Sequence, residues 1–160
     1  MRIYVTTGTG EAQTELAAFD RALMGAGVAD YNLLSLSSMI PAGSEVVLTP
    51  MPPSGDTWGQ RLYVVLAQHR ETRVGAEAWA GIGWVQNEDS GSGMFVEHEG
   101  GSSHSVEAQI EASLESMTSS RRLGFGPMHM VTAGITCGEH PVCALAVAAF
   151  GAPHPWPPTA

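Results

Sequence analysis

The chain has 160 residues, of which 44% are hydrophobic and only 14% are charged. This composition suits one domain with a single core and excludes a disordered chain. The formal net charge is −9, and all seven basic residues are arginines. We therefore exclude nucleic acids and anionic membrane surfaces as partners and expect cationic small molecules to be attracted.

The sequence also shows no sign of a membrane span or a signal peptide. No stretch reaches the roughly 18 apolar residues of a membrane span, and residues 1–11 form a strand-like run broken by glycines instead of a signal-peptide core. The two cysteines, Cys137 and Cys143, are compatible with reduced thiols. We expect a cytoplasmic protein.

The first third of the chain predicts a strand followed by a helix. Residues 2–7 are β-rich, and the glycines of residues 8–11 indicate a loop. Thr14 predicts the N-cap of a helix over residues 15–27, with Gly25 or Gly27 as its end. Its expected apolar stripe consists of Leu16, Phe19, Leu23 and Met24.

The middle of the chain predicts only strands and loops. Residues 51–59 and 87–93 are rich in turn-forming residues and indicate loops. The expected strands are residues 31–38, 44–50, 61–70, 76–86 and 93–100.

A second helix is predicted over residues 102–124. Arg121 and Arg122 are expected in its last turn, Gly124 is expected to end it, and the apolar stripe is Val106, Ile110, Leu114 and Met117.

The end of the chain contains one strand over residues 128–136 and one ambiguous segment over 141–151. In that segment the alanines favour a helix, whereas the alternation of Leu145 and Val147 favours a strand. Residues 152–160 are too rich in proline to pack regularly and are expected to form an exposed, extended tail. The whole predicts one α+β domain over residues 1–151, with each helix covering a sheet.

Two motif-like segments have simpler interpretations. Residues 5–14 lie between a strand and a helix but lack the third glycine and the lysine of nucleotide-binding loops, which leaves a glycine-rich connection. Cys137, His140 and Cys143, with His98 and His104 elsewhere, do not have the usual spacing of a zinc site. Because Cys143 opens an apolar run, a buried thiol is the better interpretation, and we expect no metal.

Two carboxylates lie next to predicted core positions. Asp20 follows Phe19 on the first helix, and Glu97 shares one strand face with Phe95. A solvated helix carboxylate and an outward-turned strand carboxylate are the simplest interpretations. A buried Glu97 would instead have a raised pKa and could donate a proton near neutrality.

Taken together, these segments resemble the pyruvoyl-dependent arginine decarboxylases. Residues 19–41 match the family in an asparagine five positions before a Ser-Ser pair, followed by two apolar residues and a proline. These positions are Asn32, Ser37, Ser38, Met39, Ile40 and Pro41. Residues 16–23 resemble the family's helix and residues 95–100 its glutamate strand. The resemblance covers roughly residues 2 to 150.

The resemblance implies that the chain cleaves itself between Ser37 and Ser38. Fragments 1–37 and 38–160 would form, Asn32 would assist, and Ser38 would become a pyruvoyl group. The ketone of that group condenses with the α-amine of an amino acid and draws off electrons as carbon dioxide leaves.

The family's substrate is L-arginine and its product agmatine. By resemblance, Glu97 donates the proton that replaces carbon dioxide. Asp20 binds the guanidinium group, because a carboxylate can accept two parallel hydrogen bonds from that fork. Leu23 and Ser37 complete the substrate contacts.

The resemblance also implies a four-layer αββα sandwich of the pyruvoyl-dependent histidine/arginine decarboxylase type. The family assembles as trimers or dimers of trimers with active sites between subunits. Two alternatives remain open. Loops 51–59 and 87–93 could build a pocket for another amino acid, or the chain could be an uncleaved, non-catalytic subunit. The joint presence of Asn32, Ser38, Glu97 and Asp20 argues against the second alternative.

Overall fold

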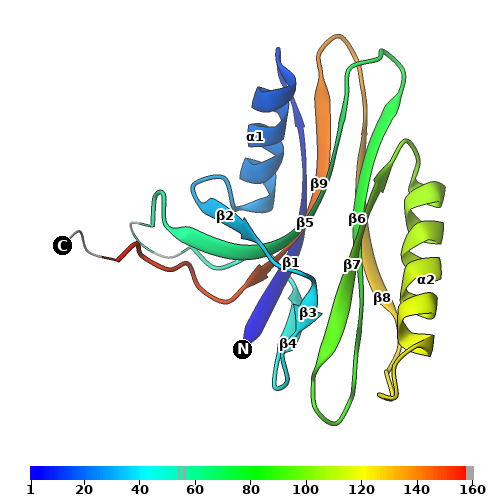
Figure 1. Cartoon of the computed structure of the whole chain (residues 1–160). Coiled ribbons are helices and arrows are strands. Elements are labelled where there is room, and N and C mark those ends of the chain that lie inside the picture. The colour runs from blue at the N-terminus through cyan, green and yellow to red at the C-terminus, as the bar shows by residue number, and fades with distance from the viewer. Residues whose placement is uncertain (54, 56, 158–160) are drawn as a thin grey trace.

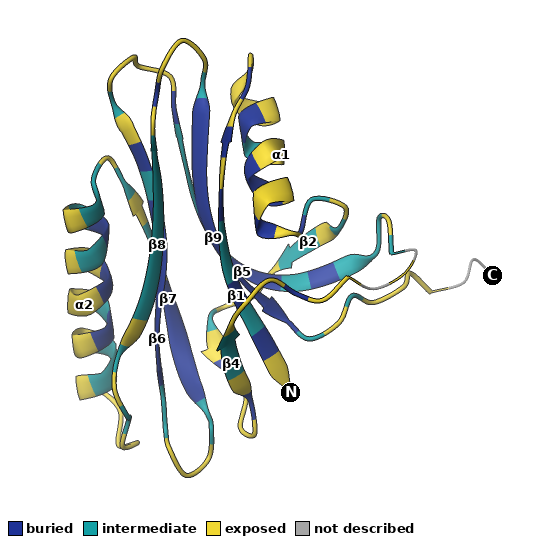
Figure 2. Cartoon of the chain, turned by 180° about the vertical axis from the view of Figure 1, so that it is seen from behind, coloured by how far each residue is buried: buried dark blue, intermediate teal, exposed yellow. Residues whose placement is uncertain are grey.

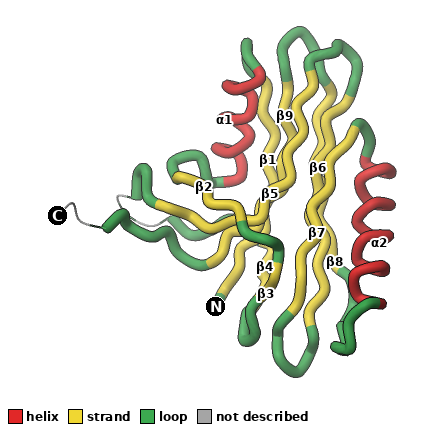
Figure 3. Tube along the Cα trace, in the orientation of Figure 1, coloured by secondary structure: helices red, strands yellow, loops and turns green. Residues whose placement is uncertain are grey.

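A computed structural model describes residues 1–53, 55 and 57–157 of the chain. Two β-sheets lie face to face, and one helix covers the outer side of each, so that the layers follow the order αββα (Figure 1). The tube in Figure 3 shows the two helices on opposite outer sides of the sandwich. The predicted fold class is confirmed. In the described parts of the chain, neither helix is long and apolar enough to cross a membrane.

The first sheet has five strands in the order β2-β5-β9-β1-β4. Its central strand β9 pairs antiparallel with both β5 and β1, whereas β4 and β2 are parallel edge strands. The strands are β1 (Arg2–Glu11), β2 (Asn32–Ser35), β4 (Glu45–Leu48), β5 (Arg61–Glu71) and β9 (Val142–Phe150).

The second sheet has four antiparallel strands in the order β3-β7-β6-β8. Its β7 has the predicted bounds. The strands are β3 (Met39–Ile40), β6 (Glu77–Gln86), β7 (Gly93–Gly100) and β8 (His129–Thr136).

The ambiguous segment near the C-terminus is a strand because it is covered on both faces. Every residue of β9 is buried, as the unbroken dark blue of this strand in Figure 2 shows. Its alternate side chains belong to the core between the sheets and to the core beneath α1. A strand buried on both faces needs no polar alternation, so the alanines do not indicate a helix here.

The first helix, α1 (Glu15–Ala26), begins and ends as predicted. The Thr14 hydroxyl accepts a hydrogen bond from the Ala17 N–H at 3.2 Å, and Gly27 has the left-handed φ of 77° that ends many helices. The predicted apolar stripe is wrong in part, because Leu16 and Met24 are 68% and 64% exposed.

The prediction of a loop over residues 8–11 is also wrong. The close packing of α1 on β1 explains both this error and the error in the apolar stripe. Strand β1 continues to Glu11, and its glycines let α1 pack unusually close. A Cβ atom on Gly8 would lie 2.0 Å from the Ala22 carbonyl oxygen, and one on Gly10 would lie 2.2 Å from that of Ala18. Close packing leaves room only for small helix residues, so alanines occupy the face where leucine and methionine are expected.

The second helix, α2 (Ser103–Ser119), uses its predicted stripe. Val106, Ile110 and Leu114 are completely buried against the second sheet. The helix ends at Ser119 and not near Gly124, so the prediction of its C-terminal end is wrong. The Arg121 guanidinium nevertheless donates to the Met117 carbonyl at 2.7 Å and satisfies one of the last free acceptors.

The tail is only partly as predicted. Its described residues are mostly exposed, but His154 forms a two-hydrogen-bond bridge with Arg61 at the start of β5. The remaining positions 158–160 of the predicted tail lie outside the described residues.

Candidate active site

Ser38 has an unusual backbone conformation. It lies between β2 of one sheet and β3 of the other, and its φ is +66°. Among the described residues, all others with positive φ are glycines. A residue with a Cβ atom in this left-handed region costs roughly 1–2 kcal/mol. The peptide bond between Ser37 and Ser38 therefore joins a strained residue, as often occurs at reacting positions.

The Ser38 side chain contacts the predicted glutamate. Its Oγ lies 3.0 Å from Oε1 and 2.9 Å from Oε2 of Glu97, and the hydroxyl donates to this carboxylate. The Phe95 N–H donates to the Ser38 carbonyl at 2.8 Å. Residue 38 is thus held from β7 at both its side chain and its backbone.

The strand pattern explains the position of Glu97. Phe95 is fully buried in the core between the sheets, and Glu97 lies two positions further along the same strand. Alternation places both on the inner face. Glu97 lies beyond the packed core, where it is exposed in the single chain. His98 faces the other way and contacts Ser113 of α2 at 2.8 Å.

Asn32 is placed away from Ser38 within one chain. From Asn32 to Leu36 the chain is extended along β5, and the Leu36 N–H donates to Val64. Four residues of strand span about 13 Å. The Asn32 side chain donates to the Gly59 carbonyl at 2.6 Å. No sequence signal indicated that Gly59 would hold this amide.

Asp20 and Leu23 lie on α1, on the outer face of the five-stranded sheet. Both line a hollow of about 460 Å³ with Leu16 and Phe19. Asp20 also lines a larger hollow of about 810 Å³, which Asp30 and the loop after Pro50 border. Neither Ser38 nor Glu97 is among the described residues that line these hollows. One chain therefore brings Ser38 and Glu97 together but leaves Asp20 elsewhere.

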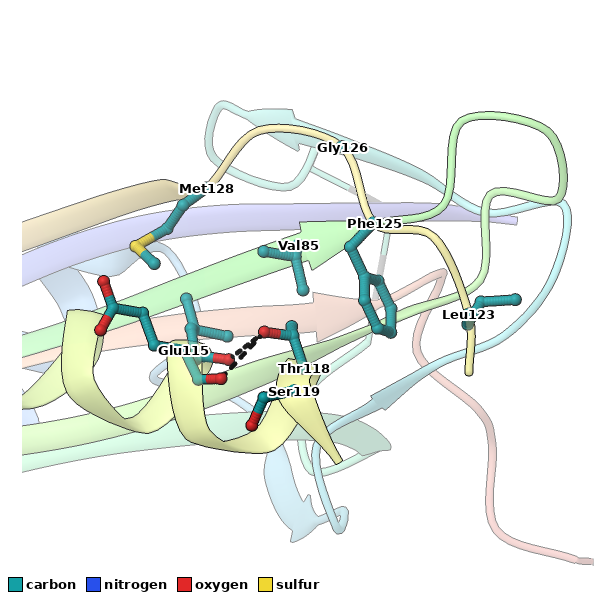
Figure 4. Close-up of a pocket in the computed structure, with 9 residues that line it drawn as sticks. Val85, Glu115, Thr118, Ser119, Leu123, Phe125, Gly126 and Met128 are labelled. Carbon is teal, nitrogen blue, oxygen red and sulfur yellow. Dashed lines mark hydrogen bonds between the residues drawn. The ribbon is translucent and has the colours of Figure 1, made fainter. Parts of the chain in front are cut away.

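A further hollow lies between the end of α2 and residues 123–128 (Figure 4). In the close-up, Phe125 and Val85 point into it, and the Thr118 hydroxyl donates to the Leu114 and Glu115 carbonyls. It contains none of the predicted site residues.

The cysteines that were considered as metal ligands are buried and free. Burial raises the pKa of the Cys143 thiol to about 11. In the described residues, no three His, Cys, Asp or Glu side chains gather so that they could hold a metal ion.

Comparison with known proteins connects this geometry to a family. The family model described as pyruvoyl-dependent arginine decarboxylase matches residues 2–154. The chain belongs to this family. A pyruvoyl-dependent arginine decarboxylase from Halobacterium salinarum is 40% identical over 96 residues, which are 60% of this chain and 59% of the relative.

Two further relatives of this pyruvoyl-dependent arginine decarboxylase family are similar over shorter or more divergent stretches. Pyruvoyl-dependent arginine decarboxylase 2 from Archaeoglobus fulgidus is 31% identical over 61% of this chain and 63% of its own length. The enzyme from Methanopyrus kandleri is 51% identical over 32% of this chain and 34% of its own length. The aligned stretches thus span less than two thirds of these relatives.

The family implies a covalently bound pyruvoyl group, and the residues around position 38 fit one. Ser38 carries the three carbon atoms from which such a group is made. The Phe95 N–H fixes the carbonyl that this group would retain, and the Glu97 carboxylate lies beside its side chain. Ser37 and Met39 on either side are exposed, which leaves access to this position.

Proposed function

We propose that the chain cleaves itself between Ser37 and Ser38 and then converts L-arginine to agmatine and carbon dioxide. The observation that supports this most is the contact of the Ser38 hydroxyl with both carboxylate oxygens of Glu97, made by a serine with positive φ. A hydroxyl that donates to a carboxylate is prepared to lose its proton as it attacks a carbonyl.

In the proposed cleavage, Ser38 Oγ bonds to the carbonyl carbon of Ser37 and its proton passes to Glu97. The Ser37–Ser38 amide bond breaks, so an ester replaces the amide and the nitrogen of residue 38 takes up a proton. Loss of the Ser38 α-proton then expels the carboxylate of Ser37 and leaves a dehydroalanine. Water replaces its nitrogen, ammonia leaves, and residue 38 becomes pyruvoyl.

The pyruvoyl group supplies the electron sink for decarboxylation. Of the chain's own residues, the Phe95 N–H orients the retained carbonyl of residue 38. Glu97 lies next to this residue and is the group placed to return a proton to the substrate carbon when carbon dioxide leaves. Ser37, the new C-terminus of the first fragment, remains beside this position as a substrate contact.

Recognition of arginine rests on Asp20 and Leu23. Asp20 is exposed on α1 and is free to accept two parallel hydrogen bonds from a guanidinium fork. Leu23 lines the same hollow and offers an apolar wall for the methylene groups of the substrate. The net charge of −9 favours a cationic substrate over a neutral one.

The separation of Asp20 from Glu97 supports a site shared by two copies of the chain. The hollows that Asp20 lines also contain the exposed apolar side chains of Leu16, Met24 and Trp58. Such a surface next to a recognition residue suits burial by another subunit. A head-to-tail contact that closes on itself gives a ring, and we propose a homotrimer or a dimer of trimers. Reduced Cys137 and Cys143 support a cytoplasmic location.

Intact mass spectrometry tests the central proposal. The purified wild-type chain should give fragments 1–37 and 38–160, the second lighter by one ammonia than a chain that begins with serine. Ser38→Ala should remain whole and should release no carbon dioxide from arginine. The matched control is Ser35→Ala, an exposed serine on β2 that should cleave as the wild type does. A wild-type chain that stays whole after long incubation contradicts the proposal.

The same preparation distinguishes the alternatives. A cleaved chain that decarboxylates another amino acid faster than arginine retains the chemistry but not the substrate. Mixing Ser38→Ala with Asp20→Asn chains tests the shared site. If each site takes Glu97 and Asp20 from different copies, mixed oligomers should contain some sites with neither change and recover activity. A fully active monomer would refute this assembly.

A further inference from the structure

The carbonyl of Gly59 accepts two side-chain hydrogen bonds. One comes from Nδ2 of Asn32 at 2.6 Å and the other from the indole Nε1–H of Trp156 at 2.9 Å. A carbonyl oxygen has two lone pairs, so these donors use its full capacity. Two residues separated by most of the chain thus meet at one backbone atom.

The backbone around this carbonyl is fixed by its turn. The Gly59 N–H donates to the Asp30 carbonyl at 2.7 Å, and the Asn32 N–H donates to the Gln60 carbonyl at 2.8 Å. Gly59 has a φ of +72°, which glycine adopts without cost. The turn therefore presents its carbonyl to Asn32 in one direction.

Trp156 reaches this turn because the tail is attached to the start of β5. His154 and Arg61 exchange two backbone hydrogen bonds of 2.8 and 2.9 Å. The Arg61 guanidinium donates to the Pro155 carbonyl at 2.7 Å and lies 5.0 Å from the centre of the Trp156 ring. Figures 1 and 2 show the C-terminal segment beside the start of β5 from opposite sides.

We propose that Trp156 is a positioning residue for Asn32, and this inference rests on the self-cleavage proposed above. Trp156 lies two positions beyond residue 154, where the match to the family model ends. By sharing the Gly59 carbonyl, the indole limits the movement of the atom to which the Asn32 amide is bound.

The consequence for Asn32 follows from the chemistry of an amide. With one Nδ2–H committed to Gly59, the Oδ1 atom and the second Nδ2–H are left for other partners. Because Asn32 lies away from Ser38 of its own chain, they serve as an acceptor and a donor for the cleavage site of another copy in the proposed oligomer. Without the indole N–H the Gly59 carbonyl is held by one partner fewer, and the Asn32 amide samples more orientations.

The test compares Trp156→Phe with Trp79→Phe in the full-length chain. Phenylalanine at position 156 keeps an aromatic ring over Arg61 and removes only the N–H donor. Trp79 is the matched control, because its indole donates to Glu77 at 2.9 Å on the other sheet. The measurements are the rate of appearance of fragment 38–160 by mass spectrometry and the thermal midpoint.

We expect Trp156→Phe to slow cleavage about three- to tenfold, on the scale of one hydrogen bond, with a thermal midpoint close to that of the wild type. Trp79→Phe should cleave at the wild-type rate. In the double variant Asn32→Ala with Trp156→Phe, cleavage should be no slower than in Asn32→Ala alone, because Trp156 acts through Asn32. Additive slowing, or a wild-type rate for Trp156→Phe, overturns the proposal.

A measurement on a chain that cannot cleave tests this inference independently of the proposed function. In the Ser38→Ala chain, which cannot cleave, the side-chain NH₂ resonance of Asn32 is assigned by its loss in Asn32→Asp. Adding Trp156→Phe should speed hydrogen exchange of that NH₂ about three- to tenfold. An unchanged exchange rate overturns the role of Trp156. A wild-type chain that never cleaves instead overturns the proposed function.

Discussion

The positive φ of Ser38 predicts that two substitutions at this position differ in stability. Ser38→Ala and Ser38→Gly both remove the hydroxyl, so both chains stay whole and both lose the same hydrogen bonds to Glu97. The variants then differ in the cost of the left-handed backbone, which alanine bears and glycine does not.

The size of the difference follows from two opposing terms. The left-handed conformation costs alanine roughly 1–2 kcal/mol, and the greater freedom of glycine in the unfolded chain offsets about 0.4–1 kcal/mol. Taken at the midpoints of these ranges, the Gly variant should be more stable by about 0.8 kcal/mol. For a domain of this size that is about 1–4 °C in thermal midpoint.

Urea unfolding followed by circular dichroism, at one fixed protein concentration, measures this difference. The control pair is Ser35→Ala and Ser35→Gly. Because Ser35 lies in β2, alanine should be the more stable there, and the sign should reverse. If the Ala variant at position 38 were as stable as the Gly variant, residue 38 would not be strained before cleavage.

Four further predictions concern single side chains. Glu97→Gln should slow cleavage and, in the cleaved fraction, lower kcat about 100-fold or more in steady-state assays, because an amide donates no equivalent proton. Asp20→Asn should mainly raise KM for arginine, by about 30-fold or more if a desolvated charge pair is lost, and reduce selectivity over uncharged amino acids. Hydrogen bonds from the Arg73 side chain, and from backbone N–H groups, lower the pKa of Glu71 to about 2. Glu71 is therefore stabilising above its ordinary pKa near 4.5, and the stability lost in Glu71→Gln should shrink as urea unfolding is repeated from pH 5 down to pH 2. Cys143, whose pKa burial raises to about 11, should resist alkylation at pH 8 until the chain is unfolded.

Local features of the fold were predictable because their causes are local. Thr14 and Gly27 bound α1 through contacts within a few residues, and the apolar run at the start of β7 lies between Gly93 and Gly100. The extension of β1 through Gly8 and Gly10 was not predictable in this way. These glycines serve the close approach of α1, a contact between two elements that no window of sequence contains.

The candidate site likewise depends on contacts between distant parts of the chain that local sequence does not predict. Ser38 and Glu97 are 59 residues apart, and their pairing follows from the family's order of motifs and not from any spacing rule. The position of Asp20 away from Ser38 depends on which faces the helix and the sheets cover. Asn32 and Trp156 both donate to the Gly59 carbonyl. The sequence indicates this contact only weakly, through a tryptophan within a proline-rich tail.

The topology explains how a chain with this fold can be cut next to residue 38 without coming apart. Fragment 1–37 would contain β1, α1 and β2, and every strand that pairs with them belongs to fragment 38–160. Strand β1 lies between β9 and β4, and β2 pairs with β5. Removal of the first fragment would uncover the outer face of this sheet, which α1 covers, and would leave β5 and β9 without their partners β2 and β1, so the fragments would remain one folded unit. The proposed cut would fall where the chain crosses from one sheet to the other, at the one serine with positive φ among the described residues. Breaking that crossing would release the strain at residue 38 and would leave the strand pairing of both sheets unbroken.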